Sequence, residues 1–220
     1  MKKTFLLSCL MLAAMPVMAA YTGRVYVDKN KNGVFDPGEK TWAGIKVSDG
    51  LNVVETAADG SFTLPGHERE RFIFITTPSG YKTFNRHYHK IEKKQSGYDF
   101  DLIPYSGRIR KDGSHRYIHI TDTEIFNTEN HADWVNNVHD YARNEQAAFI
   151  IHTGDICYEK GLKAHIKLMN TENMDCPVFY CIGNHDLVKG KYGEELFESI
   201  YGPVYYSFDA GNVHYVVTPM

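Results

Sequence analysis

Short hydrophobic runs dominate the chain between residues 20 and 105, and turn-forming residues separate them. The runs lie at 23–27, 45–47, 61–64 and 72–75. The pairs that interrupt them include Asp49-Gly50, Asp59-Gly60 and Pro65-Gly66. Runs of β-branched and aromatic residues bounded by glycine, proline and aspartate are typical of strands in all-β domains. The pattern therefore predicts a small β-sandwich over residues 20–105.

A different pattern begins at residue 116, where strand-like and helix-like segments alternate. Apolar runs at 117–121, 149–152 and 178–182 are candidate strands. Hydrophobic residues recur at helical spacing between them, at Trp134, Val138, Tyr141 and Ala142 and again at Leu162, Ile166 and Met169. A third helix is expected around 196–200, and two more strands at 205–208 and 213–217. This alternation predicts an α/β domain with parallel strands over residues 116–220, joined to the sandwich by a linker at 106–115.

Residues 1–19 have the three features of a secretory signal peptide. Lys2 and Lys3 precede an apolar stretch at 5–17, and small residues follow it, ending at Ala19. A membrane anchor is the alternative, but the apolar stretch is shorter than a bilayer requires. The sequence thus predicts a periplasmic or secreted protein with no stable membrane span after signal cleavage.

Charge and cysteine content exclude several classes of protein. The formal net charge of −3 provides no basic surface for nucleic acid or anionic membrane. Cys157, Cys176 and Cys181 are the cysteines outside the leader, and an odd number argues against a disulfide framework. The chain has 11 histidines, and we expect those in polar surroundings, such as His87 and His139, to be exposed.

Residues 28–39 match the twelve-residue calcium loop position by position. Carboxylate, amide and main-chain oxygens fall at the spacing that Ca²⁺ requires, with Gly33 at the sharp turn. The predicted calcium ligands are Asp28, Asn30, Asn32, the Val34 carbonyl, Asp36 and Glu39. Strands rather than helices flank this loop, so a helix-loop-helix sensor is not expected. The alternative is a polar hairpin loop without an ion.

Three strand ends carry oxygen ligands for a metal ion. Asp122 follows the first predicted strand, Asp155 the second, and Asn184 the third. Asp155 has two oxygens that can bridge two ions, which is the arrangement used for phosphoester hydrolysis. His185 could protonate the leaving oxygen, and Asp186 could orient His185. His152 is equally well explained as a supporting residue or as an ordinary strand histidine.

At these residues the chain resembles the calcineurin-like metallophosphoesterase superfamily. Asp122, Gly154-Asp155 and the run Gly183-Asn184-His185-Asp186 match three of its blocks in order, and the resemblance covers residues 116–220. It implies an αββα sandwich, two transition metal ions (Mn, Fe or Zn), and a phosphorylated small molecule or phosphodiester as substrate. A β-sandwich before this domain is similar to exported bacterial members, and the 21–80 segment resembles calcium-stabilised β-sandwich repeats of bacterial surface proteins.

The sequence departs from the family pattern at two places. Glu124 stands where the family has a histidine, and it could serve as an oxygen ligand favouring a harder metal or could face solvent. The later histidine-bearing blocks do not occur before Met220, so the α/β domain is predicted to be incomplete and the sequence a fragment. Tyr158 also fits a Gly-Asp-x-x-Tyr block of purple acid phosphatases, which makes it either an iron ligand or a packing residue.

Two functions follow from these features. The first is a metal-dependent phosphoester hydrolase acting outside the cytoplasm, with metal-activated water attacking phosphorus. The second is a non-catalytic, calcium-stabilised β-sandwich module for surface binding, followed by a vestigial phosphoesterase segment. Bound transition metal distinguishes the two, because only the enzyme requires it.

Overall fold

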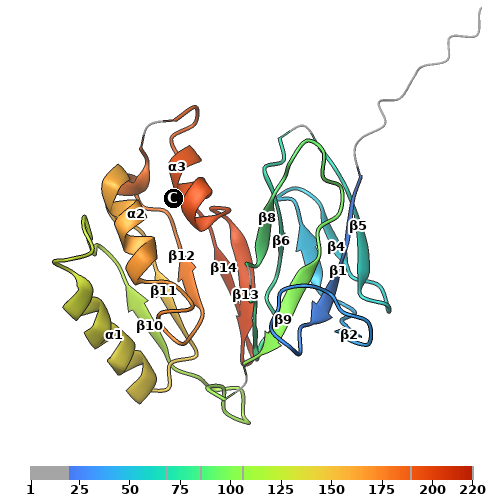
Figure 1. The fold of residues 1–220 in the computed structure, drawn as a ribbon, viewed down its shortest axis with the longest axis horizontal. Coiled ribbons are helices and arrows are strands. Elements are labelled where there is room, and N and C mark those ends of the chain that lie inside the picture. The colour runs from blue at the N-terminus through green and yellow to red at the C-terminus, as the bar shows by residue number, and fades with distance from the viewer. Residues whose placement is uncertain (1–19, 68, 85, 106, 189, 220) are drawn as a thin grey trace, which may run out of the picture.

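The computed structural model describes residues 20–67, 69–84, 86–105, 107–188 and 190–219. The predicted signal peptide, residues 1–19, lies outside them. In the described residues no helix is long and apolar enough to cross a membrane. The chain runs in layers from two helices through a parallel sheet and a hairpin to two further sheets formed by the N-terminal half (Figure 1).

The N-terminal half contains two sheets. The first has the order β2-β1-β9-β7, with β5 also paired to β1, and the second has the order β4-β3-β6-β8. The strands of the first sheet are β1 (Ala20–Val27), β2 (Lys40–Thr41), β5 (Ser61–Pro65), β7 (Tyr81–Lys82) and β9 (Phe100–Pro104). Those of the second are β3 (Lys46–Ser48), β4 (Val53–Glu55), β6 (Phe72–Ile75) and β8 (Tyr88–Lys90).

Hydrophobic side chains of both sheets meet in one core. In β5, Phe62 and Leu64 are buried and their neighbours are exposed, which is the period-two pattern of a strand with one wet face. They pack with Val25 of the first sheet and with Ile73 and Ile75 of the second. Side chains from the two sheets of the N-terminal half thus share one buried cluster.

The C-terminal half is built on a parallel three-stranded sheet of order β10-β11-β12. Its elements are β10 (Tyr117–Ile120), α1 (Ala132–Asn144), β11 (Phe149–His152), α2 (Glu159–Leu168) and β12 (Val178–Tyr180). Ile150 and Val178 face a cluster that includes Val135 and Ala142 of α1. Phe149 and Phe179 face the opposite side, so β11 and β12 are buried on both faces, whereas β10 is partly exposed. Burial on both faces explains why β11 and β12 are nearly continuous hydrophobic runs.

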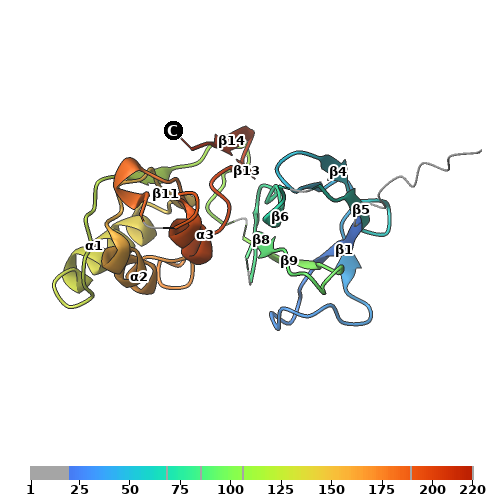
Figure 2. The same cartoon turned by 90° about the horizontal axis from the view of Figure 1, so that it is seen from above.

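A hairpin, rather than a second helix layer, covers the other face of this sheet. It consists of β13 (Tyr206–Ala210) and β14 (Val213–Val217), and it follows α3 (Glu195–Tyr201). The Phe179 ring stacks on Phe208 of β13 at 3.6 Å between centroids. Seen from above, the hairpin stands between the parallel sheet and the N-terminal strands (Figure 2). Among the described elements, helices lie on one face only, so the second helix layer of the predicted αββα sandwich is not seen.

The two halves share a hydrophobic cluster and an ion pair. Phe72, Phe74 and Tyr88 of the N-terminal half pack in the same cluster as Phe179 and Phe208. A main-chain hydrogen bond also joins the two halves, because the Asp209 amide donates to the Thr77 carbonyl at 2.9 Å. Arg71, which precedes β6, makes a bidentate contact with Glu198 of α3 at 2.6 and 2.9 Å.

Three expectations about side chains need correction. Trp134 and Tyr141 were predicted on the buried face of α1, but both are exposed; Ala142 is buried as predicted, and Val135, which was not in the predicted set, is buried as well. His87 was expected to be exposed, but its ring lies among Tyr88, Phe179 and Tyr206. None of the three errors is visible locally, because the tertiary packing decides which of several apolar or aromatic positions is covered. The three cysteines are free.

Candidate metal centre

The carboxyl ends of β10, β11 and β12 meet at one edge of the sheet and bring the predicted ligands together. Parallel pairing in register, Ile120 with His152 and His152 with Tyr180, puts the three following loops side by side. The Asp122 amide donates to the Gly154 carbonyl at 3.2 Å. The sequence prediction of a shared edge is thus consistent with the register of the sheet.

Three of the predicted metal ligands have a left-handed backbone. The φ angles are 55° at Asp122, 45° at Glu124 and 50° at Asp155. This conformation is uncommon for residues other than glycine, and it persists where the surrounding structure enforces it. Residues held in this way cluster at functional sites, so the backbone of these loops marks the same positions as the sequence motif.

Two glycines allow the second and third loops to touch. A β-carbon at Gly183 would overlap the Asp155 amide nitrogen and carboxylate, and one at Gly154 would overlap the Gly183 main chain. The contact lets the His185 amide donate to Asp155 Oδ1 at 3.0 Å. The glycines therefore position the carboxylate of Asp155 against the start of the Asn184–Asp186 turn.

Asp186 is fully buried and holds the same two loops by their main chains. Its Oδ1 accepts from the amides of Ile156 at 2.8 Å and Cys157 at 3.1 Å, and its Oδ2 accepts from Gly183 at 2.9 Å. Burial raises the pKa of this carboxyl, and the three amides oppose that effect. The predicted role was to orient the His185 side chain, but these contacts instead fix the backbone on either side of Asp155 and His185.

The His185 ring lies between an aromatic residue and a carboxylate. Tyr158 stacks on it with centroids 5.1 Å apart and planes 19° from parallel. Glu124 Oε1 lies 3.7 Å from its Nδ1. Nδ1 is itself buried and makes no hydrogen bond within the described part of the chain. Glu124, which replaces the histidine of the family pattern, therefore lies beside His185 and remains exposed.

His152 and Thr123 connect the first and second loops; the sequence had left open a supporting role for His152 but gave no sign of Thr123. The amide of Gly154 donates to His152 Nδ1 at 3.3 Å, and Nε2 lies 3.0 Å from Thr123 Oγ1. Burial lowers the pKa of His152 to about 4, although Asp122 and Asp155 act in the opposite direction. The ring is therefore neutral at pH 7, and it fixes Thr123 between Asp122 and Glu124.

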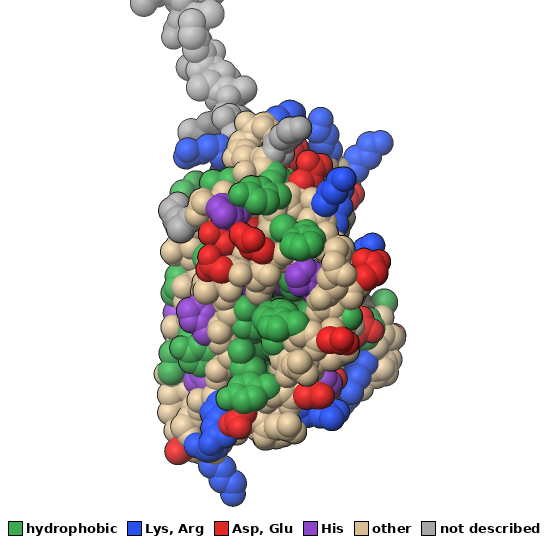
Figure 3. Space-filling view, turned by 90° about the vertical axis from the view of Figure 1, so that its left-hand side faces the viewer, with side chains coloured by type: hydrophobic (Ala, Val, Ile, Leu, Met, Phe, Trp, Pro, Cys, Tyr) green, Lys and Arg blue, Asp and Glu red, His purple; other side chains and the backbone are tan. Residues whose placement is uncertain are grey.

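The residues present suit a metal ion in the chemistry of their donors. Asp122, Glu124 and Asn184 are exposed, Asp155 is partly buried, and His185 Nδ1 lacks a hydrogen-bond partner among the described residues. Of the described Asp, Glu, His and Cys side chains, those at this edge do not bring three ligand atoms within 4.8 Å of one another. The ligand atoms at the ends of these strands are therefore spread apart rather than gathered around one ion. A more closely spaced group of metal-ligating side chains lies in the N-terminal half. The face of the molecule seen in Figure 3 intermixes hydrophobic, acidic and histidine side chains.

The predicted calcium loop connects β1 to β2, and its side chains contact one another. Asp28 accepts from the amides of Lys31 at 2.6 Å and Gly33 at 2.8 Å. Glu39 accepts from the amides of Lys29 at 2.9 Å and Asp36 at 3.0 Å. The side-chain amides of the two predicted asparagine ligands donate to Asp36 Oδ2, that of Asn30 at 2.7 Å and that of Asn32 at 2.8 Å. The exposed Val34 donates its amide to Asn32 Oδ1 at 2.9 Å.

Two family models match the chain, one for each half. Residues 29–104 match the N terminal of Calcineurin-like phosphoesterase. Residues 115–217 match Calcineurin-like phosphoesterase. No curated protein matches the chain. The second match covers all the strand ends described above, and the first covers the strands of the N-terminal half from β2 to β9 but not β1.

Proposed function

Because this chain belongs to the calcineurin-like phosphoesterase family, we propose that it hydrolyses phosphoesters at the carboxyl ends of β10, β11 and β12. The observation that carries the proposal is the contact between the Gly154 and Gly183 loops. It places the Asp155 carboxylate 3.0 Å from the His185 amide, in a region where three neighbouring loops present oxygen ligands.

In this proposal each residue has a distinct task. Asp122, Glu124, Asp155 and Asn184 would hold two ions of Mn, Fe or Zn, with Asp155 shared between them. Bound ions of this kind neutralise phosphoryl charge and activate water for attack on phosphorus. His185, with its partly exposed ring, would give a proton to the leaving oxygen. Asp186 and His152 would keep the three loops at fixed positions, since neither touches the open side of the site.

The test is hydrolysis of nitrophenyl phosphate and bis(nitrophenyl) phosphate by the full chain, first stripped with chelator and then given Mn²⁺, Fe²⁺ or Zn²⁺. Asp155→Asn should lower kcat by about two orders of magnitude or more, because one ligand charge is lost from both ions. Asp140→Asn on α1, which changes an exposed carboxylate, should leave the rate unchanged. Equal activity of the Asp155 variant and the original chain would contradict the proposal.

Comparing the two substrates also tests whether the enzyme prefers phosphomonoesters or phosphodiesters, since the proposed substrate is either a phosphorylated small molecule or a phosphodiester. Absence of hydrolysis with every metal, in a folded chain that still binds Ca²⁺, would favour the alternative of a non-catalytic binding module. We place the protein outside the cytoplasm on the basis of residues 1–19. N-terminal sequencing of exported protein should then begin near residue 20.

We also propose that the N-terminal half is a small β-sandwich that binds Ca²⁺ at residues 28–39. Support comes from the convergence of Asp28, Asp36 and Glu39 within a loop between paired strands. Calcium at about 100 times its Kd should add about 2.7 kcal/mol to the free energy of unfolding. Asp28→Asn should abolish this increment, whereas Asp59→Asn at another turn should keep it. An increment of the same size in both variants would argue for the ion-free hairpin.

A further inference from the structure

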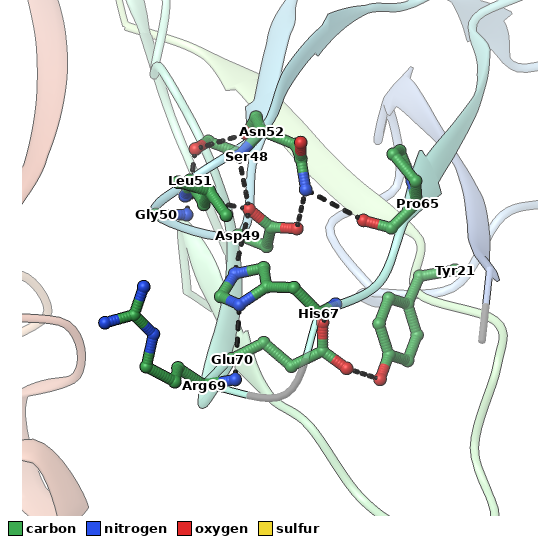
Figure 4. A network of polar contacts seen from close by, with 10 residues as sticks. All are labelled: Tyr21, Ser48, Asp49, Gly50, Leu51, Asn52, Pro65, His67, Arg69 and Glu70. Carbon is green, nitrogen blue, oxygen red and sulfur yellow. Dashed lines mark hydrogen bonds and ion pairs between the residues drawn. The ribbon is translucent and has the colours of Figure 1, made fainter. Parts of the chain in front are cut away.

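A second group of metal-ligating side chains lies in the N-terminal half, away from the strand-end site. Asp49 follows β3, and His67 and Glu70 belong to the connection between β5 and β6 (Figure 4). One ligand atom from each lies within 4.8 Å of the other two. It is the tightest such group in the part of the chain that the structure describes.

Contacts with neighbouring groups hold the two carboxylates in place. Asp49 Oδ1 accepts from the amides of Leu51 at 2.9 Å and Asn52 at 2.7 Å, and its Oδ2 accepts from the Asn52 side chain at 3.0 Å. Glu70 accepts from the Tyr21 hydroxyl with one oxygen and from the His67 amide with the other. Outer contacts of this kind orient ligands in metal sites and reduce the cost of binding.

Burial makes the charge of this group costly. The Asp49 side chain is 0% exposed and that of His67 is 17% exposed. His67 Nε2 has no exposed surface and makes no hydrogen bond within the described residues, although it lies 3.5 Å from Asp49 Oδ1. The group brings two carboxylates together beside one imidazole, and a divalent cation would balance the carboxylate charge.

We propose that Asp49, His67 and Glu70 bind a divalent transition metal ion, with Zn²⁺ favoured. One imidazole nitrogen and two carboxylate oxygens form a three-ligand set that suits Zn²⁺ and leaves a position for water. The nitrogen donor argues against Ca²⁺ and Mg²⁺, which take oxygen ligands. A cavity of about 520 Å³ lined by Tyr21, His67 and Glu70 gives the ion and its water a route from solvent.

Binding at Nε2 requires a shift of the imidazole proton. His67 Nδ1 accepts from the Arg69 amide at 3.2 Å, so in the neutral ring the proton resides on Nε2. An ion at Nε2 takes the place of that proton, which moves to Nδ1, and the ring stays neutral. The Arg69 amide then faces a donor and must turn away. Metal binding is therefore coupled to a reorientation of the Arg69 amide.

The role of this ion would be structural. It would join the turn between β3 and β4 to the loop before β6, and thereby connect that turn to the segment that carries Arg71. The site is independent of phosphoester hydrolysis, and its ion is distinct from that of the 28–39 loop. Its loss should lower stability without removing the catalytic residues.

The experiment uses the full chain carrying Asp155→Asn, so that the strand-end site is weakened. Chelator-treated protein in excess Ca²⁺ is titrated with Zn²⁺ while the unfolding temperature is followed, and with Co²⁺ while its visible absorption is followed. We expect a Zn²⁺-induced rise in the unfolding temperature and a Co²⁺ spectrum with nitrogen and oxygen ligation, each saturating at one ion per chain.

Variants of the group identify the ligands. His67→Gln and Glu70→Gln should each weaken Co²⁺ binding by about 10- to 100-fold or more. Glu70→Gln keeps a side chain that can still contact Tyr21, so it separates loss of the ligand from loss of packing. His139→Gln is the control, since His139 also pairs with two carboxylates, Asp140 and Asp175, but on the surface. An unchanged Co²⁺ spectrum and Zn²⁺ shift in His67→Gln would overturn the proposal.

Discussion

At the scale of single residues, the strand-end site is built from side chains with different degrees of freedom. Asp155 is fixed by its left-handed backbone and by the His185 amide. Asp186 is fixed by three main-chain donors. The His185 ring, by contrast, has a Nδ1 without a hydrogen-bond partner in the described part of the chain, and it rests on Tyr158. The proposed proton donor thus depends on an aromatic contact for its orientation.

The sequence left two explanations for Tyr158, an iron ligand or a packing residue, and substitutions at this position can distinguish them. Its side chain is 60% exposed, and its ring lies parallel to that of His185. A stacked aromatic pair is worth about 0.5–1.5 kcal/mol, so Tyr158→Ala should lower kcat about 2- to 10-fold. Tyr158→Phe keeps the ring and should retain the rate. If both variants lost activity equally, along with bound iron, the hydroxyl would be acting as a metal ligand instead.

At the scale of elements, the strands and their ends could be predicted because the information is local. Continuous hydrophobic runs predicted β10, β11 and β12, and Gly-Asp and Gly-Asn-His-Asp predicted the loops after them. A supporting role for His152 was one of two open explanations, but its contact with Thr123 could not be predicted, since it joins positions 29 residues apart whose pairing depends on strand register. The prediction of the buried face of α1 was partly wrong for a similar reason. Trp134 and Val135 are adjacent in the sequence, and tertiary packing determines which of the two is buried.

The close approach of two loops gives a test at this scale. A β-carbon in Gly183→Ala would overlap main-chain and carboxylate atoms of Asp155, so the two loops must separate. A displacement of about 1 Å at a reacting group can cost about 100-fold in rate, and we expect a loss of kcat of that order. Gly97→Ala is the matched control, because nothing lies within 4 Å of its added carbon. Retention of full activity by Gly183→Ala would show that the contact is dispensable.

At the scale of the whole molecule, the two halves pack against each other through a shared hydrophobic cluster and an ion pair. The shared cluster of Phe72, Phe74, Phe179 and Phe208 is buried from both sides. The two family matches divide the chain near residue 110. The hydrophobic packing, by contrast, is continuous between the two halves. The alternation of hydrophobic residues predicts each half separately, and contacts between halves have no signature in local sequence.

The Arg71–Glu198 ion pair provides a measure of this coupling. The Glu198 side chain is 3% exposed and accepts from two guanidinium nitrogens and from the Tyr192 hydroxyl. Glu198→Gln should lower the free energy of unfolding by about 1.5–3 kcal/mol, because a buried charged hydrogen bond is lost. Glu55→Gln removes the exposed pair with Lys46 and should cost less than about 1 kcal/mol. Similar costs in urea unfolding would mean that the pair contributes little to joining the halves.

His87 makes the same interface sensitive to acid. Its Nε2 is buried without a hydrogen-bond partner among the described residues, and its ring lies 4.7 Å from that of Tyr206. Burial, reinforced by the charge of Arg86, lowers the pKa of His87 to about 4. Between pH 6.5 and 4 the unfolded chain therefore binds a proton that the folded chain does not, and stability falls as the pH falls through this range.

The size of this effect can be isolated by substitution. One such proton changes the free energy of unfolding by up to about 1.4 kcal/mol per pH unit. His87→Phe keeps an aromatic ring among Tyr88, Phe179 and Tyr206 but cannot be protonated. Its free energy of unfolding, measured by urea titration from pH 7 to pH 4, should decline less steeply than that of the original chain. His152 and His165 have lowered pKa values as well, so part of the decline should remain in the variant. If the free energies of unfolding of the variant and the original chain declined equally with pH, water would reach the His87 ring in solution, and the interface would be less tightly closed than its packing indicates.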